Sequence, residues 1–593
     1  MSKIIIFDYE VFKFDTLLGC IIRENGTRRV FQEWDFEKIK KFFEENKNAL
    51  WVGHNNYYYD DLITESIVFN KNPYETSQKL IGREEYLKLK LKFPSIDLMK
   101  LKEGKDNEYK LKLTELLCGK NIHESEIDFN LPRALTEEEK KQVEGYNYDD
   151  LDQTEYNFLM MQESIKLKIG IIQKFSLNFI DNIRSSMTNI ASKILFSEYK
   201  SSLQYAKMPI VMYDNLIINN EDVKEFYLQE HFKTDKEIQI KLCGTEVKLS
   251  GEGALHGSIK KFFSDKVLYA DVTGFYNLIA IVYDLLPRTL SEEGKKRYTE
   301  MYYEQLKLKK TNPVQREQYK TVLLAVIGSM KLKESPFYDP ETYTLLTMTG
   351  KLFMIDLLEK LEGLALLVQV NTDGLMLEPY NWEDEPKIKA IIKEWSDRTK
   401  FSIKVENLYR LWQRDVNCYV CADEEENIIA KGDVLKNYDI SDKAYAKQSF
   451  FKCKEPPIIA QGIVNLLMYN IKPEEFVSQN KKNLKLFQYF CQKTSKVDYL
   501  TYDTINLCTK EQSTELLQGV DRVFALKSSE ILGTVYKHSG TKFGKHKISK
   551  YPSLPDNVFV YNYALNDFPL DFYDKIDYQY YIDRIYQKIK EFI

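Results

Sequence analysis

The sequence predicts a multidomain protein that combines α/β and α+β units. Its 593 residues exceed what a single hydrophobic core organises, and a length prior of about 150 residues per unit suggests roughly four. β-Branched runs typical of strands, such as residues 3–12, alternate with capped, helix-like stretches such as residues 136–165. Short acidic clusters recur in and between these segments.

Composition narrows the class of protein. Hydrophobic residues make up 44% and charged residues 29% of the chain, as in soluble globular proteins. Runs of 18 apolar residues are absent from the sequence, and its N-terminus reaches acidic residues too early for a signal peptide. The eight cysteines lack the two CxxC pairs of a zinc ribbon, so a reducing cytoplasm fits. The net charge of −5 is not that of a typical nucleic-acid binder, but carboxylate metal sites would themselves lower it.

The first acidic cluster lies in the strand predicted for residues 3–12. Alternation of side chains places Asp8 and Glu10 on one face, about 6–7 Å apart along the strand, so both can reach one pair of metals. A solvent-facing strand edge is the plainer alternative for such a motif taken alone. Residues 51–63 then show a strand end, a polar loop and a helix start, with Asp60 at the beginning of that helix.

The third cluster lies on a helix predicted for residues 136–165. Thr136 is the expected N-cap, and Glu139 follows at the capping-box spacing. Tyr146 and Asp150 are four residues apart and therefore share a face. This spacing suits a pair in which Asp150 holds a metal and Tyr146 orients an attacking water. Together the three clusters predict a carboxylate cage for two divalent metals.

A second acidic pair lies downstream. Residues 267–280 read as a strand, a turn and a helix, with Asp271 where the strand ends. Residues 366–379 are two apolar runs around Thr372-Asp373-Gly374, a tight-hairpin signature that thrusts Asp373 out of a sheet. A capping Asp and an ordinary Asp-Gly hairpin are the alternatives. Because two-metal carboxylate sites catalyse in-line displacement at phosphorus, two such sites suggest an enzyme that makes and breaks phosphodiester bonds.

These motifs, in this order, resemble a known family. The first three clusters resemble the DEDDy-type 3′–5′ exonuclease domain, and the whole chain resembles the family B DNA polymerases of bacteriophages. Asp271 matches motif A (DxxSLYP), with Gly274 and Asn277 in place of the usual Ser and Pro; Asp373 matches the second carboxylate of motif C (DTD), with Asn371 in place of the first. The resemblance implies Tyr146 as the water-positioning residue. The metal ligands that it implies are Asp8, Glu10, Asp60, Asp150, Asp271 and Asp373.

The resemblance also implies a nucleotide site. Tyr276 stands five residues after Asp271, where the family places the ring that excludes a 2′-hydroxyl, and Val272 is expected beside the nucleotide. Residues 291–311 and 314–330 read as two helices joined at Asn312-Pro313, a minimal fingers hairpin. The second carries Lys320, the expected triphosphate ligand; one of many solvated lysines is the alternative. Where the family pattern KxxxNSxYG has Asn and Tyr, this chain has Leu324 and Ile327, which we expect to line the nucleotide pocket as apolar surface.

DNA contacts are expected at two basic segments. Residues 411–436 have a β-hairpin pattern ending in Lys431-Gly432, similar to the family segment that holds the primer terminus. Residues 535–552 are lysine-rich and contain glycines, which predicts a loop that follows a phosphate backbone. A solvated basic loop is the alternative there. The expected phosphate ligands in it are Lys542, Lys545 and Lys547.

The resemblance implies a domain order. It places an RNase H-like exonuclease domain first, then a palm of antiparallel sheet and helices that is interrupted by short helical fingers, and last a thumb. The implied segments are exonuclease 1–165, linker and palm support 166–255, palm with motif A 256–290, fingers 291–331, palm with motif C 332–440 and thumb 441–593.

The expected function is that of a DNA-dependent DNA polymerase with 3′–5′ proofreading that replicates a phage genome in the host cytoplasm. Mg²⁺, two ions per active site, suits all-carboxylate ligands, with Mn²⁺ as the alternative. The expected partners are primer–template DNA and dNTPs, then phage helicase, primase or single-strand binding protein; a monomer without membrane attachment is expected. One alternative is a 3′–5′ exonuclease whose polymerase half only binds DNA, and another is a non-catalytic replication scaffold.

Overall fold

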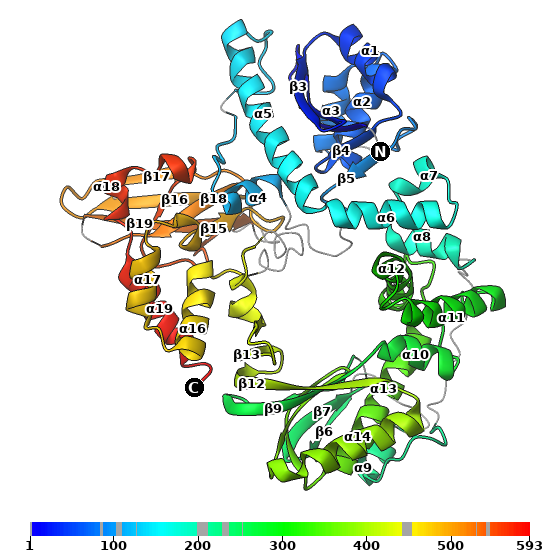
Figure 1. Cartoon of the computed structure of the whole chain (residues 1–593). Coiled ribbons are helices and arrows are strands. Elements are labelled where there is room, and N and C mark those ends of the chain that lie inside the picture. Colours follow the sequence, from blue (N-terminus) through cyan, green and yellow to red (C-terminus); the bar gives the residue numbers. More distant parts are fainter. Residues whose placement is uncertain are drawn as a thin grey trace. The chain divides into compact units, whose positions relative to one another are not determined.

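The chain divides into two compact units in a computed structural model (Figure 1). The structure describes residues 3–82, 87–101, 110–125, 127–197, 212–227, 236–251, 253–441, 453–528, 530–540 and 546–593. Unit 1 comprises residues 1–186, 439–459 and 474–583, and unit 2 comprises residues 187–438, 460–473 and 584–593. The chain is multidomain and of mixed α/β type with several antiparallel sheets, as the sequence predicts. The finer division into six segments stays a prediction.

Unit 1 contains a five-stranded mixed sheet in the order β3-β2-β1-β4-β5. The apolar run KIIIF begins the central strand β1, which pairs antiparallel with β2 and parallel with β4. Alternate residues of β1, among them Phe7 and Tyr9, enter a core with Trp51 and Phe43. The strands are β1 (Lys3–Val11), β2 (Thr16–Glu24), β3 (Thr27–Glu33), β4 (Leu50–Gly53) and β5 (Ser95–Asp97).

A long helix, α5 (Glu137–Met160), packs on β1 and β2. It begins as predicted: Thr136 accepts from the N–H of Glu139, and the Glu139 carboxylate accepts from the N–H of Thr136. This capping box fixes the residue at which the helix begins, and therefore which of its later residues lie next to β1 and β2. The other helices of residues 1–186 are α1 (Phe36–Asn46), α2 (Asp60–Val68), α3 (Pro73–Gly82), α4 (Leu111–Cys118), α6 (Gln162–Lys174) and α7 (Phe179–Ile183).

The C-terminal part of unit 1 holds two smaller antiparallel sheets, β15-β18-β21 and β17-β16-β19-β20. Fully buried Arg522 connects this part to α4, since its guanidinium donates to the carbonyl oxygens of Leu116 and Lys120. Burial lowers the pKa of Arg522 to about 9. The strands are β15 (Tyr489–Gln492), β16 (Tyr499–Asn506), β17 (Gln512–Leu516), β18 (Val520–Ala525), β19 (Ile531–Gly540), β20 (His546–Lys550) and β21 (Val558–Val560). Helix α18 (Leu570–Tyr573) lies in this region, and α17 (Pro473–Asn480) does so from residue 474 onward. Helices α16 (Pro457–Tyr469) and α19 (Tyr578–Ile589) begin in unit 1 and end in unit 2.

Unit 2 is built on a nine-stranded sheet in the order β14-β13-β12-β9-β11-β10-β8-β7-β6. The hairpin predicted around Thr372 is confirmed as β10 and β11, and β11 pairs with β9. The strands are β6 (Glu237–Leu242), β7 (Thr245–Ser250), β8 (His256–Ser258), β9 (Phe262–Val272), β10 (Ala365–Asn371), β11 (Gly374–Pro379), β12 (Ile403–Asp415), β13 (Cys418–Ala422) and β14 (Ile428–Lys431).

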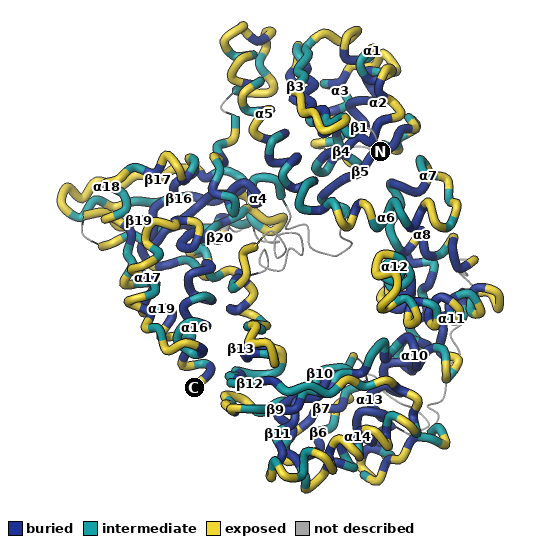
Figure 2. Tube along the Cα trace, in the orientation of Figure 1, coloured by how far each residue is buried: buried dark blue, intermediate teal, exposed yellow. Residues whose placement is uncertain are grey.

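Helices of unit 2 pack on this sheet and continue beyond it. The nearly continuously buried helix α13 contacts β6, and α14 contacts β12; Figure 2 shows how much of α13 is buried. The helix pair predicted before and after Asn312-Pro313 is confirmed, with Asn312 as the N-cap of the second helix. The helices are α8 (Met187–Ile194), α9 (Glu221–Tyr227), α10 (Phe275–Val282), α11 (Glu292–Lys307), α12 (Pro313–Ser329), α13 (Pro340–Leu361) and α14 (Glu385–Thr399).

One local prediction is wrong. The basic segment 535–552 is not a loop over its described residues, because 536–540 of β19 pair antiparallel with 546–550 of β20. Glycine and lysine content suggested a loop, but Val535 and Tyr536 are residue types that favour strands, and Val535 is buried in β19. Across the described part of the chain, none of the helices has both the length and the apolar character needed to cross a membrane.

Two candidate carboxylate sites

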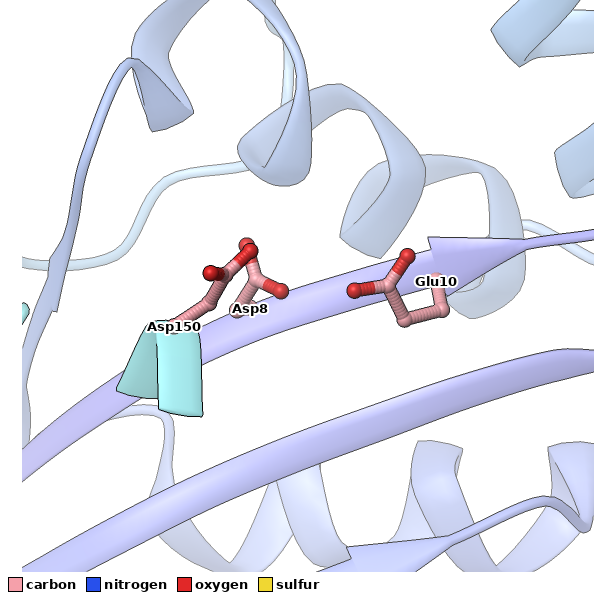
Figure 3. Close-up of side chains that lie close together, drawn as sticks. All are labelled: Asp8, Glu10 and Asp150. Atoms are coloured by element: carbon pink, nitrogen blue, oxygen red, sulfur yellow. The ribbon is translucent and has the colours of Figure 1, made fainter. Parts of the chain in front are cut away.

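In unit 1, three carboxylates converge at one point. Asp8 and Glu10 lie on β1, and Asp150 comes from α5; each offers an oxygen within 4.8 Å of those of the other two (Figure 3). This group is the one set of three or more potential metal ligands that lie so close together among the described residues. The alternation of side chains along β1 and the capped start of α5 bring these residues together.

Asp60, the fourth predicted ligand, meets β1 from another direction. It is the first residue of α2, and its carboxylate accepts from the backbone N–H of Tyr9 at 3.1 Å. The pairing of β4 with β1 covers residues 4–6 of β1 and ends at Ile6, so the N–H of Tyr9 is not used by that pairing. Asp60 is therefore fixed beside the strand between Asp8 and Glu10, and its charge acts on Asp8.

A glycine lets α5 approach the sheet closely. Gly19 of β2 lies directly opposite Asp8, and a Cβ at Gly19 would stand only 1.7 Å from Oδ1 of Asn147. The side-chain amide of Asn147 can therefore reach across and donate to Asp8 at 2.9 Å. Close helix–sheet packing at Gly19 thus sets the position of Asp150, one helical turn after Asn147.

A buried cation stands beside Asp150. Lys112 of α4 lies 2.7 Å from Asp150 and 3.1 Å from Glu115, and its ammonium group lies 4.5 Å from the ring centroid of Tyr146. Burial of Lys112 opposes its charge, but Asp150 and Glu115 together raise its pKa. Tyr146 and Asp150 thus share one side of α5, as predicted, with Lys112 between them. Burial raises the pKa of the Tyr146 phenol, which keeps its proton.

The electrostatics of this site fit a cation. Burial, reinforced by neighbouring carboxylates, raises the pKa of Asp8 and of Glu10 well above the usual range. Burial also raises the pKa of Asp60. Oxygen-only ligands of high charge density suit a hard divalent ion such as Mg²⁺, and its charge would relieve their mutual repulsion. The donor set therefore fits the expected metal.

Stability should reveal this repulsion. In the unfolded chain these carboxyl groups lose their protons near pH 4, and in the folded protein they do so at a higher pH. The folded protein is therefore most stable at low pH, and it loses stability as the pH rises from about 4 through the pKa of the folded state. Glu10→Gln removes the buried charge, so in EDTA at pH 8 it should raise the melting temperature, by roughly 2–4 °C per kcal/mol regained. At pH 4 the gain should vanish, and Mg²⁺ should stabilise the wild type more than the variant.

Thermal unfolding in EDTA and in Mg²⁺ at both pH values measures this effect. The matched control is Glu24→Gln on the neighbouring strand β2, where the carboxylate is exposed and 3.5 Å from Lys3. A melting temperature for Glu10→Gln at or below that of the wild type at pH 8 would contradict the assignment of mutual repulsion among these carboxylates.

In unit 2, Asp271 and Asp373 meet at the end of β9. Asp271 lies opposite Gly374 of β11, and the N–H of Val272 donates to the carbonyl oxygen of Asp373 at 3.0 Å. Burial and the charge of Asp271 raise the pKa of Asp373 to about 6. Residues 102 positions apart in sequence therefore form one electrostatic pair, and a proton competes with any cation for Asp373 below about pH 6.

The turn that carries Asp373 is strained. Thr372 has φ 63°, a left-handed value that β-branched residues rarely adopt, and the N–H of Asp373 donates to the carbonyl oxygen of Asn371 at 2.8 Å. Such a γ-turn costs on the order of 1–3 kcal/mol. Two hydrogen bonds hold the turn in place. The N–H of Thr372 donates to the carbonyl oxygen of Leu255, and the side chains of Asn371 and His256 are hydrogen-bonded at 2.9 Å. These hydrogen bonds hold the strained turn and so keep Asp373 beside Asp271.

Three side chains act on the Asp271–Asp373 pair: Tyr269, Lys431 and Tyr276. Tyr269 donates to Asp271 at 3.1 Å, and the charge of Lys431 at the end of β14 also acts on Asp271, although burial raises the pKa of Asp271 overall. Asp373 acts in turn on the phenol of Tyr276, whose pKa is raised mainly by burial. The ring of Tyr276 lies over Gly350 of α13, where an added Cβ would be 3.1 Å from it.

The predicted nucleotide ligands lie in different environments. Lys320 on α12 is half-exposed and 3.6 Å from Glu317. Leu324 is 51% exposed, whereas Ile327 is buried, so only Leu324 offers the apolar surface expected of both. Ile327 packs inward because its position on α12 faces the neighbouring helices rather than solvent. The side chain of Val272 is buried in the sheet, which leaves main-chain atoms for any nucleotide contact.

The predicted DNA ligands of the tail belong to unit 1. Lys547 lies on β20 opposite Ser539 and is exposed. Lys542 and Lys545 fall outside the described residues. Lys431 lies in unit 2, where its ammonium group is 5.7 Å from the ring centroid of Tyr419.

Comparisons with known proteins find similarity in structure but not in sequence. The sequence matches no protein-family model and no curated protein. Among solved structures, the chain is similar to the family B DNA polymerase from the hyperthermophilic archaeon Pyrobaculum calidifontis, with a TM-score of 0.44 and 13% sequence identity over 100% of this chain and 78% of that chain. At this level of similarity, function has to be inferred from the two carboxylate sites themselves.

Sequence reasoning missed several residues at these sites. Asn147 and Tyr269 carried a usable signal, since each shares a face with a predicted ligand: three residues before Asp150 on a helix, and two before Asp271 on a strand. Lys112 carried none. It lies 38 residues before Asp150 and reaches it only through the packing of α4 on α5.

Proposed function

We propose that this protein is a DNA-dependent DNA polymerase of the family B type, with a 3′–5′ proofreading exonuclease, that replicates a phage genome. The observation that carries the proposal is the Asp271–Asp373 pair, held at the junction of β9 and a strained hairpin. The carboxylate group on β1 and α5 supports the second activity. The mixed sheet of unit 1 and the antiparallel sheet of unit 2 are compatible with RNase H-like and palm folds, respectively.

In unit 2, Asp271 and Asp373 would hold Mg²⁺. When bound, a pair of divalent ions stabilises the attacking and leaving oxygens of an in-line displacement at phosphorus. Tyr269 restrains the Asp271 carboxylate through its hydrogen bond, and the γ-turn at Thr372 restrains Asp373. Lys431 supplies positive charge beside Asp271, suited to the primer terminus. Lys320 supplies a point charge on α12 for a triphosphate.

In unit 1, Asp8, Glu10, Asp60 and Asp150 would hold the metal pair for hydrolysis. Asn147 orients Asp8, and Lys112 orients Asp150. The protonated phenol of Tyr146, on the same side of α5 as Asp150, can accept from and donate to an attacking water. These residues would position a terminal phosphodiester and the water that cleaves it, which removes a mispaired nucleotide.

The test is a labelled primer annealed to a longer template with Mg²⁺. We expect elongation to the template end when all four dNTPs are present and stepwise shortening from the 3′ end when they are absent. Shortening without elongation would instead favour an exonuclease whose polymerase half only binds DNA, and neither reaction would contradict the proposal.

Sugar selection supplies a sharper test of the nucleotide site. Tyr276 lies in the first turn of α10, five residues after Asp271, and the charge of Asp373 acts on it, so its ring would block a 2′-hydroxyl. Tyr276→Ala should therefore admit ribonucleotides more readily, on the order of a thousandfold for about 4 kcal/mol of lost discrimination. Single-nucleotide incorporation of rCTP against dCTP measures the ratio, with exposed Tyr380→Ala as the control. An unchanged ratio in Tyr276→Ala would place sugar selection elsewhere.

A further inference from the structure

A cavity of about 510 Å³ lies in unit 1 apart from the carboxylate group. Its walls come from the turn after β1, the first turns of α1 and the connection between α2 and α3. Phe12 and Phe14 enter it two and four residues after Glu10. Its volume is within the 300–1,000 Å³ typical of small-molecule sites.

The charge of this cavity is positive. Lys13, Lys40 and Lys71 line it, against the single carboxylate of Glu37. Within the described part of the chain, none of these lysines has a carboxylate at ion-pair distance; Lys40 instead donates to the side chain of Asn70 at 2.8 Å. Three lysines against one carboxylate leave the lining of this cavity with a net positive charge, which favours an anionic ligand.

Two aromatic rings at the cavity are exposed to solvent. Phe14 is 55% exposed and Phe36 is 44% exposed, although their neighbours Phe12 and Ile39 are buried. The ammonium group of Lys13 lies 5.5 Å from the ring centroid of Phe14. An exposed ring next to a cation offers a planar, π-rich ligand a stacking surface and a phosphate contact at once.

The walls of the cavity are held rigidly. Asn70 adopts φ 56° after α2, and the N–H of Lys71 donates to the carbonyl oxygen of Ser66 at 2.7 Å. Asn72 accepts from the N–H of Tyr74 at 2.9 Å and so caps α3. The N–H of Phe12 donates to Asp15 at 2.8 Å across the turn that carries Lys13 and Phe14. A preformed site loses little entropy on binding.

We propose that this cavity binds one nucleotide unit, with its phosphate among Lys13, Lys40 and Lys71 and its base against Phe14 or Phe36. The unit has two possible sources: a nucleotide within a single strand, or a free mononucleotide. The inference goes beyond the proposed catalytic function, because binding here needs neither metal ions nor either carboxylate site.

Photo-crosslinking locates the site directly. The full chain in EDTA is irradiated with an oligothymidylate carrying 5-iododeoxyuridine, and separately with free 5-iodo-dUMP; tryptic peptides are then mapped. We expect crosslinks in residues 14–23 or 30–38, which contain Phe14 and Phe36. Crosslinks with the oligonucleotide alone would assign the site to a strand, and crosslinks with 5-iodo-dUMP as well would assign it to a free nucleotide. If neither probe crosslinks to either peptide, the proposal is overturned.

Binding of a fluorescent oligothymidylate, followed by anisotropy in EDTA, gives the energetic test. Lys13→Gln with Lys71→Gln should weaken binding about tenfold and reduce the slope of log K against log salt by about 1.4, for two phosphate contacts. The matched control, Lys38→Gln with Lys41→Gln, removes the same charge from exposed positions of α1 outside the cavity. The mutations remove trypsin sites, so the peptide that contains Phe14 is 4–23 in the cavity variant and the peptide that contains Phe36 is 30–40 in the control. Loss of crosslinks from the peptides that contain Phe14 and Phe36 in the cavity variant alone supports the site; equal crosslinking in both variants overturns it. Neither result bears on the proposed polymerase and exonuclease activities, which the primer assays test separately.

Discussion

Replacing Asp373 by asparagine should reduce primer extension by at least about a thousandfold, about 4 kcal/mol of lost transition-state stabilisation, and leave primer degradation unchanged. Asparagine keeps the shape of the turn and removes the charge that faces Asp271. Degradation should persist because its carboxylates lie in a separate compact unit. Extension is measured as single-nucleotide incorporation, and degradation as loss of the 3′ nucleotide without dNTPs.

The matched control for this variant is Asp265→Asn. Asp265 lies on β9, the strand that carries Asp271, but is exposed. It should extend primers like the wild type. If Asp373→Asn extends primers within tenfold of the wild-type rate, the carboxylate pair of unit 2 is not the site of synthesis.

The opposite pattern is expected for Asp8→Ala combined with Glu10→Ala. These changes remove two of the three carboxylates that converge in unit 1, so shortening of the primer should fall by at least about a thousandfold while extension continues. Misincorporated 3′ ends should then persist. Glu24→Gln on β2 is the control. Residual shortening at the wild-type rate would mean that hydrolysis occurs elsewhere in the chain.

Much of both sites was predictable from local rules. The period of a strand placed Asp8 and Glu10 on one face, and the Thr136 capping box fixed the start of α5, which carries Asp150. The hairpin signature around Thr372 correctly predicted that Asp373 sits at a turn. In each case the signal lies within a few residues, where periodicity and turn chemistry act.

The rest depends on contacts between distant segments. Lys112 reaches Asp150 only because α4 packs on α5, and α4 is itself anchored by Arg522, more than 400 residues further on. Local spacing does not reveal such contacts. The strain at Thr372 was also hidden, since a β-branched residue at positive φ runs against its own preference. The strands at residues 536–540 and 546–550 were misjudged because the glycine and lysine content of the segment was given more weight than the strand-favouring Val535 and Tyr536.

The measurement that tests the central claim most directly is the conversion of labelled dTTP to dTMP on a primed oligoadenylate template. Turnover requires that a nucleotide is first incorporated and then excised, so both carboxylate sites must work on the same DNA end. We predict steady dTMP release by the wild type, and none by Asp373→Asn or by Asp8→Ala with Glu10→Ala. Release of dTMP at the wild-type rate by either variant would contradict the assignment of synthesis and hydrolysis to two separate sites.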